Sequence, residues 1–305
     1  MCEVNTALKA RFCKDNNLSI QLFHEPYFMD RIELFGQLDK WNDFVKMLEQ
    51  YNTAEDYFAE YNRVKDGAIG YIKESTAFLH LNQSQDAFER IFDSIPDRDA
   101  YKEMNIGRRF LSIDMSKANF SCLVVYAKRT GTKFYDTFDY ESFMGMFTNN
   151  EHIKKSKYIR QVIFGNCNCK RMISFEKTLM HEALYQLVSN GIIPENELEK
   201  VYALRADEII VDITELDNTI VENLLKYEFE FPTKKEIYTL KHIKNEDIYI
   251  KAFDDGSYEI KKCNAEELSA LYRFLHYGVI SDLDLYFYHG DRIAKFMETK
   301  EYEVE

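Results

Sequence analysis

The chain has 305 residues and a mass of 36.2 kDa, which exceeds the usual size of one domain and provides enough material for a substantial core. Hydrophobic residues make up 46% of the sequence and charged residues 30%, so wholesale disorder is excluded. The formal net charge of −13 excludes broad, nonspecific coating of nucleic acid, and any nucleic-acid site must be a local basic patch, because phosphate binding needs cations.

The first hundred residues are predicted to be mostly helical. Apolar side chains recur at helical spacing over 41–51, and similar stripes continue over 57–72 and 88–95. Pro96 and the polar residues that follow it interrupt this pattern. We therefore expect a helical N-terminal region over residues 1–100.

The middle third of the chain alternates between strands and helices. Residues 110–113 form a short apolar run that predicts a buried strand. Helices are predicted over 117–128, 150–165 and 174–190. Two further apolar runs, at 201–206 and 209–213, flank an acidic pair and predict a β-hairpin with the acids at or near its turn. These elements define a predicted core region over 101–231.

The last third changes to short segments in which apolar and polar residues alternate. Strands are predicted over 237–240, 248–252 and 258–260. Asp255 and Gly256, which lie between the last two, are typical of a hairpin turn, and a helix carrying Leu268 and Leu271 follows. Residues 232–305 are therefore expected to form a small α+β appendage.

The N-terminal residues lack a basic segment followed by an apolar run, and no stretch approaches the roughly 18 apolar residues of a membrane helix. The sequence therefore predicts a cytoplasmic protein without a membrane span. Its 6 cysteines are scattered without the spacing of a disulfide framework, so free thiols are expected.

Acidic residues follow or interrupt two of the predicted strands. Asp114 comes directly after the strand at 110–113, and Asp207 and Glu208 lie at or near the turn of the predicted hairpin. If the strands are neighbours, Asp114 and Asp207 converge. Two carboxylates held on strand ends can bind a pair of divalent cations about 3.5–4 Å apart, which suits Mg²⁺ or Mn²⁺ and the activation of a 3′ hydroxyl.

A local basic patch lies between these acids in the sequence. It contains Lys154, Lys155, Lys157, Arg160, Lys170 and Arg171, with no Asp or Glu between Glu151 and Glu176. On a helix, Lys157, Arg160 and Phe164 would share one face, because they are spaced i, i+3 and i+7. That face would fit a nucleoside triphosphate, with the base stacked on the aromatic ring.

These segments resemble motifs A, B and C of the family A DNA polymerases over roughly residues 105–213. The resemblance implies an α+β fold with a polymerase-like palm, an antiparallel sheet and fingers helices. It implies that Asp114 and Asp207 bind metal, that Glu208 supports the site and that Arg160, four residues before Phe164, replaces the triphosphate-binding lysine. Asn119 stands where the family has a glutamate that excludes ribonucleotides. Motif A alone is also similar to the corresponding strand of reverse transcriptases.

The implied partners are nucleic acid and a nucleoside triphosphate, with Lys154, Lys155, Lys170 and Arg171 as nucleic-acid contacts. The alternative function is a non-catalytic accessory factor, of the kind that viruses encode, which binds nucleic acid or protein through a polymerase-like core. A zinc site built from Cys122, Cys167, Cys169 and His152 has poor ligand spacing. Each acid by itself is most often a turn or cap residue, so the order and context of the segments carry the interpretation.

Overall fold

The computed structural model describes residues 2–84, 91–92, 95, 97–290, 292–297 and 301–305. Contacts within the chain group it into two compact units, each assembled from segments that are distant in the sequence. The helical unit comprises Met1–Gly70, Glu141–Asn166 and Lys262–Glu303. The sheet unit comprises Tyr71–Tyr140, Cys167–Lys261 and Val304–Glu305.

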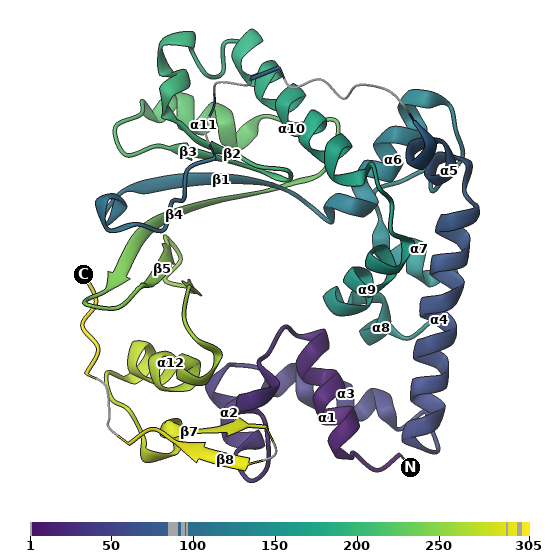
Figure 1. Ribbon diagram of the computed structural model, residues 1–305, viewed down its shortest axis with the longest axis vertical. Coiled ribbons are helices and arrows are strands. Elements are labelled where there is room, and N and C mark those ends of the chain that lie inside the picture. Colours follow the sequence, from purple (N-terminus) through teal and green to yellow (C-terminus); the bar gives the residue numbers. More distant parts are fainter. Residues whose placement is uncertain (1, 85–90, 93–94, 96, 291, 298–300) are drawn as a thin grey trace. The chain divides into compact units, whose positions relative to one another are not determined.

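Helices and one β-hairpin make up the helical unit (Figure 1). The α-helices that belong to it in whole or for the most part are α1 (Thr6–Asp15), α2 (Phe28–Leu34), α3 (Leu38–Leu48), α4 (Ala54–Glu74), α7 (Tyr140–Gly145), α8 (Glu151–Lys155), α9 (Lys157–Cys167) and α12 (Leu268–Tyr277). The antiparallel hairpin pairs β7 (Tyr286–His289) with β8 (Arg292–Lys295). Short 3₁₀ turns are η1 (Ile20–Leu22), η4 (Ala265–Glu267) and η5 (Asp282–Leu285).

The helices predicted in the N-terminal region are confirmed where the structure describes them. The segment 41–51 corresponds to α3 and the segment 57–72 to α4. In α3, Trp41, Phe44 and Leu48 are buried, as expected for an apolar stripe that faces the core. The helix predicted over 88–95 lies largely outside the described residues.

The helix predicted over 150–165 is two helices, α8 and α9, separated at Ser156. Ser156 has extended backbone dihedral angles, φ −61° and ψ 116°, which end α8. Its Oγ accepts a hydrogen bond from the Ile159 backbone N–H at 3.1 Å and so caps the start of α9. Serine competes with the helical hydrogen-bond pattern in this way, and helical periodicity alone does not reveal it.

The sheet unit contains a six-stranded antiparallel sheet, so the structure is of mixed α+β class. In spatial order its strands are β2 (Val201–Leu204), β3 (Glu208–Asp212), β1 (Arg109–Met115), β4 (Thr233–Ile243), β5 (Ile248–Phe253) and β6 (Tyr258–Lys261). Its helices are α5 (Thr76–Gln83), α6 (Ala118–Thr130), α10 (Met172–Ser189) and α11 (Asn218–Lys226), with 3₁₀ turns η2 (Glu103–Asn105) and η3 (Glu195–Lys200). Figure 1 shows α10 and α11 lying over the β1–β3 part of the sheet.

The two faces of the sheet differ because alternate residues of β1 point to opposite sides. Leu111 and Ile113 are fully buried on the face covered by helices. Phe110 points to the other face and joins an aromatic cluster with Tyr202, Tyr238 and Tyr249. Ser112 and Asp114 follow Phe110 on that same face, so the aromatic cluster and the acid belong to one surface of the sheet.

The strands expected in a C-terminal appendage belong instead to the same sheet as β1. The β4 strand pairs with the whole length of β1, from Arg109 opposite Thr239 to Met115 opposite Thr233. The predicted turn at Gly256 is present, with φ +85°. Pairing of β1 with β4 joins residues more than a hundred positions apart, which local alternation of apolar residues does not specify. The division into 1–100, 101–231 and 232–305 stays a prediction.

No helix in the described ranges is long and apolar enough to cross a membrane. All 6 cysteines are free, as their scattered spacing predicted. Four of them, Cys2, Cys13, Cys122 and Cys167, are buried. These thiols therefore pack as small apolar side chains.

Candidate carboxylate site

Asp114 and Glu208 lie directly opposite one another on neighbouring strands. The register of β1 and β3 pairs their Cα atoms, and directly opposed residues of an antiparallel pair share a face. Glu208 is the first residue of β3, directly after the turn that contains Asp207, so the two acids lie at and beside the hairpin turn, as the sequence predicted. Like charges in this position repel each other, which is unfavourable for folding.

Asp207 lies in the turn just before β3. The Met115 backbone N–H donates a hydrogen bond to the Asp207 carbonyl oxygen at 2.8 Å, so the turn is joined to the end of β1. The charge of Asp207 raises the pKa of Asp114 on β1 and that of Glu176 on α10. Asp207 is thus within electrostatic range of both carboxyl groups.

Asp114 is a half-buried acid whose surroundings disfavour its charged form. Burial raises its pKa to about 6, with the charges of Asp207 and Glu208 as the next causes, while Lys234 and Lys251 oppose the rise. Across the described ranges, no hydrogen bond or ion pair engages the carboxylate of Asp114 or Asp207. Acids this poorly compensated are candidates for a functional site.

Glu176 belongs to the same group of acids, and sequence reasoning missed it. It lies on α10 with 6% of its surface exposed, and its Oε1 has no hydrogen-bond partner among the described residues. Burial raises its pKa to about 7, followed by the charge of Asp207. A signal was present, because Glu176 precedes Leu179 and Met180 by three and four residues and so stands in an apolar stripe.

Glu208 differs from the other acids because its carboxylate is engaged. Ser112 Oγ donates to Glu208 Oε1 at 2.6 Å, and Arg205 Nη1 donates to Glu208 Oε2 at 2.9 Å. Arg205 is held in turn by Asp97, whose Oδ1 accepts from Nε at 3.0 Å. Glu208 is therefore fixed in place and suited to a supporting role.

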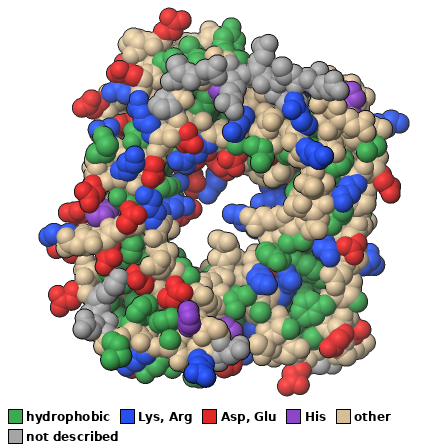
Figure 2. Space-filling model, in the orientation of Figure 1, with side chains coloured by type: hydrophobic (Ala, Val, Ile, Leu, Met, Phe, Trp, Pro, Cys, Tyr) green, Lys and Arg blue, Asp and Glu red, His purple; other side chains and the backbone are tan. Residues whose placement is uncertain are grey.

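Lys251, which sequence reasoning also missed, adds a buried cation to the face of Asp114. It lies on β5 with 6% exposure, and its Nζ stands 4.6 Å from the centre of the Tyr238 ring. Burial lowers its pKa, and the charge of Glu208 opposes that change. Figure 2 shows acidic and basic side chains intermixed on one face of the molecule.

The other predicted site residues are divided between the two units. Asn119 lies in the first turn of α6, and Lys170 and Arg171 immediately precede α10, so these three belong to the sheet unit with the acids. The helical unit contains Lys154 and Lys155 on α8 and Lys157, Arg160 and Phe164 on α9. The predicted site residues therefore do not all belong to one unit.

Two cations of the predicted basic patch are already paired. Lys154 and Lys155 both form ion pairs with Glu151, the latter at 3.5 Å. Phe164 is 8% exposed and packs in the core, so little of its ring is available to stack on a base. Lys157, at the start of α9, is an exposed cation.

The donors near Asp114 suit a hard divalent cation, since carboxylate oxygens are the preferred ligands of Mg²⁺. Within the described residues, no group of three or more His, Cys, Asp or Glu side chains is arranged to hold a metal ion. Mg²⁺ is commonly held by one or two carboxylates, with water and substrate phosphates completing the shell. Asp114 and Asp207 supply carboxylates of the kind that such a shell uses.

Searches among protein families, curated proteins and solved structures found no match to this chain. The fold and the candidate site are therefore characterised by their own geometry. They define an α+β protein with Asp114 and Asp207 at one end of the paired strands β1 and β3.

Proposed function

We propose that the protein is a metal-dependent nucleotidyltransferase, a small nucleic-acid polymerase that adds nucleotides to a 3′ hydroxyl. The observation that carries this proposal is the position of Asp114 and Asp207. They come from segments about ninety residues apart, they lie at the same end of two paired strands, and no described side chain forms a hydrogen bond or ion pair with either carboxylate. A divalent cation would favour the ionised form of Asp114, whose pKa is raised by burial and then by the charges of Asp207 and Glu208.

In this proposal Asp114 and Asp207 would hold Mg²⁺ or Mn²⁺. When bound, such a cation activates a hydroxyl nucleophile and stabilises charge on the phosphates. Glu208, fixed by Ser112 and Arg205, keeps negative charge beside the metal ligands. Lys251 limits the repulsion between the acids, because its charge favours the ionised form of Asp114.

Substrate contacts follow from the resemblance to family A polymerases. Lys157 and Arg160 would hold the triphosphate, and Asn119 would lie near the sugar. The remaining cations of the basic patch would contact nucleic acid: Lys154, Lys155, Lys170 and Arg171. A cytoplasmic location is part of the same proposal.

Primer extension tests the proposal directly. With a primed template, nucleoside triphosphates and Mg²⁺ or Mn²⁺, wild-type protein should lengthen the primer. Asp114→Asn and Asp207→Asn should each lower the rate by about a thousandfold, since each removes a charge that acts on the reacting phosphate. Asp254→Asn, an exposed acid of the sheet unit, is the control and should match wild type. Equal rates in all proteins would refute the mechanism.

The second candidate is a non-catalytic accessory factor that binds nucleic acid or protein. It is favoured by the lack, across the described ranges, of a three-ligand metal group and by the net charge of −13. Binding of an oligonucleotide in the presence of EDTA, measured at increasing salt, separates the candidates. Salt-sensitive binding without any metal-dependent incorporation would select the accessory factor.

A further inference from the structure

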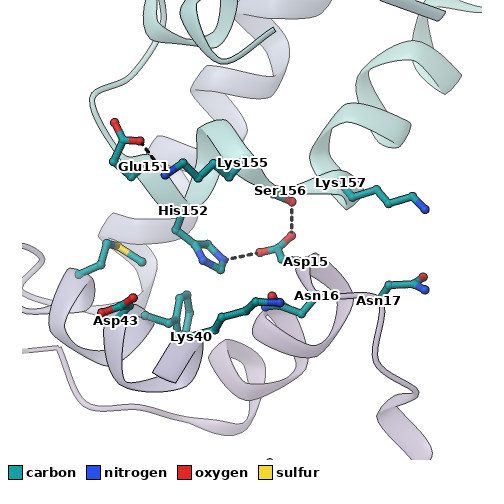
Figure 3. A pocket seen from close by; sticks show the side chains of 12 residues that line it. Asp15, Asn16, Asn17, Lys40, Asp43, Glu151, His152, Lys155, Ser156 and Lys157 are labelled. Atoms are coloured by element: carbon teal, nitrogen blue, oxygen red, sulfur yellow. Dashed lines mark hydrogen bonds and ion pairs between the residues drawn. The ribbon is translucent and has the colours of Figure 1, made fainter. Parts of the chain in front are cut away.

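A cavity of about 560 Å³ lies inside the helical unit, bounded by the end of α1, by α3 and α8, and by the start of α9 (Figure 3). Its volume is within the range of roughly 300–1,000 Å³ that small-molecule sites occupy. Every lining residue belongs to the helical unit, so no carboxylate of the sheet unit lines the cavity.

One wall of the cavity is fixed by a buried hydrogen-bond network around Asp15, which is 6% exposed. Asp15 Oδ1 accepts from Ser156 Oγ at 2.7 Å, and Asp15 Oδ2 lies 3.0 Å from His152 Nε2. Figure 3 shows both interactions at the centre of the lining. A wall held in this way is preformed, which reduces the entropy that a ligand must overcome on binding.

The charges that face the cavity are unequal once their existing partners are counted. Three lysines line it: Lys40, Lys155 and Lys157. Three acids line it as well: Asp15, Asp43 and Glu151. Two of these acids also meet cations outside the lining, since Lys154 pairs with Glu151 and Arg11 Nη1 lies 3.9 Å from Asp15.

Lys40 and Lys157 form no ion pair within the part of the chain that the structure describes, and among the lining acids the same holds for Asp43. Both lysines are exposed, so their ammonium groups are accessible to a ligand. The excess is therefore positive, which favours an anionic ligand.

The rest of the lining suits a flat, partly apolar group. Met47 and His152 line the cavity, and the ring of Phe44, which is only 1% exposed, packs against the His152 ring at 4.7 Å between ring centres. Asn16 and Asn17 contribute side-chain amides, which both donate and accept hydrogen bonds. A base would use the apolar wall and the amides, and a phosphate would use the lysines.

We infer that this cavity binds a nucleoside phosphate, with the base toward Met47 and His152 and the phosphate toward Lys40 and Lys157. The ligand is either a free nucleotide or one nucleotide of a single strand, because both present the same chemistry. The proposed function also assigns Lys157 to the triphosphate, but no carboxylate of the sheet unit takes part here, so this binding is tested apart from nucleotidyl transfer.

Binding is measured by calorimetry in EDTA, which removes any metal-dependent binding, with ATP, inorganic pyrophosphate and a ten-nucleotide oligothymidylate as probes. ATP or the oligonucleotide should bind, and pyrophosphate should bind more weakly than ATP because it lacks a base. Tighter binding of ATP identifies the free nucleotide as the ligand, and tighter binding of the oligonucleotide identifies the strand. If pyrophosphate binds as tightly as ATP, the base does not contact the apolar wall and that assignment is refuted. If none of the probes binds, the cavity is not a nucleotide site.

Variants locate the binding. Lys40→Gln with Lys157→Gln should weaken ATP binding about tenfold, since charge-assisted contacts to phosphate are lost. Asp43→Asn should strengthen it roughly threefold, because it removes the opposing charge. Lys46→Gln, on the same helix α3 but outside the lining, is the matched control and should leave the affinity unchanged.

The double variant Asp114→Asn, Asp207→Asn should bind ATP like wild type, which separates this inference from the proposed reaction. A loss of binding in Arg160→Gln with none in the Lys40 and Lys157 variant would place the nucleotide elsewhere on α9 and refute the inference. Weaker binding in Asp43→Asn would also refute it, because that result indicates a cationic ligand.

Discussion

The two units treat their buried charges in opposite ways. In the helical unit, Asp284 is fully buried and engaged by Arg31 Nη1 at 3.1 Å, by Arg273 at 2.5 Å and by Ser269 Oγ at 3.0 Å. In the sheet unit, Asp114 and Glu176 lie in poorly solvated positions without such partners among the described residues. Buried charges are normally compensated, so the exception marks where binding or chemistry is expected.

The difference has a physical meaning. A compensated acid contributes to folding, whereas an uncompensated one opposes folding and persists only where something else requires it. The helical unit therefore uses its charges to hold α2 against the segment before β7, through Arg31 and Asp284. Three substitutions test whether the two kinds of acid behave as differently as this comparison requires.

The largest expected effect is the loss of Asp284. Asp284→Ala should lower the free energy of unfolding by about 3–5 kcal/mol, because it leaves the fully buried Arg31 without its counter-charge. Urea-induced unfolding measures the change. Asp282→Asn is the matched control, since Asp282 is exposed and pairs with Lys295 at the surface, and it should cost at most about 1 kcal/mol. Equal losses in both variants would contradict the assignment of a structural role to Asp284.

Replacement of Glu176 is expected to change the free energy of unfolding in the opposite direction. Its pKa is raised to about 7 in the folded state from an ordinary value of 4.5, so the unfolded chain loses its proton first as the pH rises. The stability of wild-type protein should therefore fall between about pH 4.5 and 7. Glu176→Gln should remove that part of the pH dependence and stabilise the protein at pH 8 by on the order of 2 kcal/mol.

Unfolding followed at several pH values checks this prediction. Glu195→Gln replaces an exposed acid of the sheet unit and should keep the wild-type pH dependence. If Glu176→Gln destabilises the protein at pH 8, the buried carboxylate has a stabilising partner, and the contrast between the two units disappears.

A smaller effect is expected at Ser156, which donates to Asp15 and caps α9. Ser156→Ala should cost about 1–2 kcal/mol of stability, because it removes a cap and a hydrogen bond to a charged acceptor. Ser19→Ala is the control, since Ser19 precedes η1 without a side-chain cap hydrogen bond. A loss at Ser19 as large as that at Ser156 would show that the Asp15 network adds nothing to the helical unit.

Local sequence was sufficient for most of the helices and for the strand that carries Asp114. The periodicity of α3 and the apolar run of β1 depend on neighbouring residues, so they could be read without knowledge of the fold. The break at Ser156 could not be read in this way, because it depends on a cap and on a contact with Asp15, which is distant in the sequence. The position of Glu208 opposite Asp114 could not be read in this way either, because it depends on the register between β1 and β3.

By itself the sequence determined which residue types were available: an acid after an apolar strand, two acids near a turn, and cations on a helix. Only the tertiary structure decided that β1 lies between β3 and β4, that Glu176 is buried on α10 and that Asp15 fixes the wall of a cavity. The reason is that strand pairing and side-chain burial depend on contacts between distant segments, whose choice is a property of the whole packed chain.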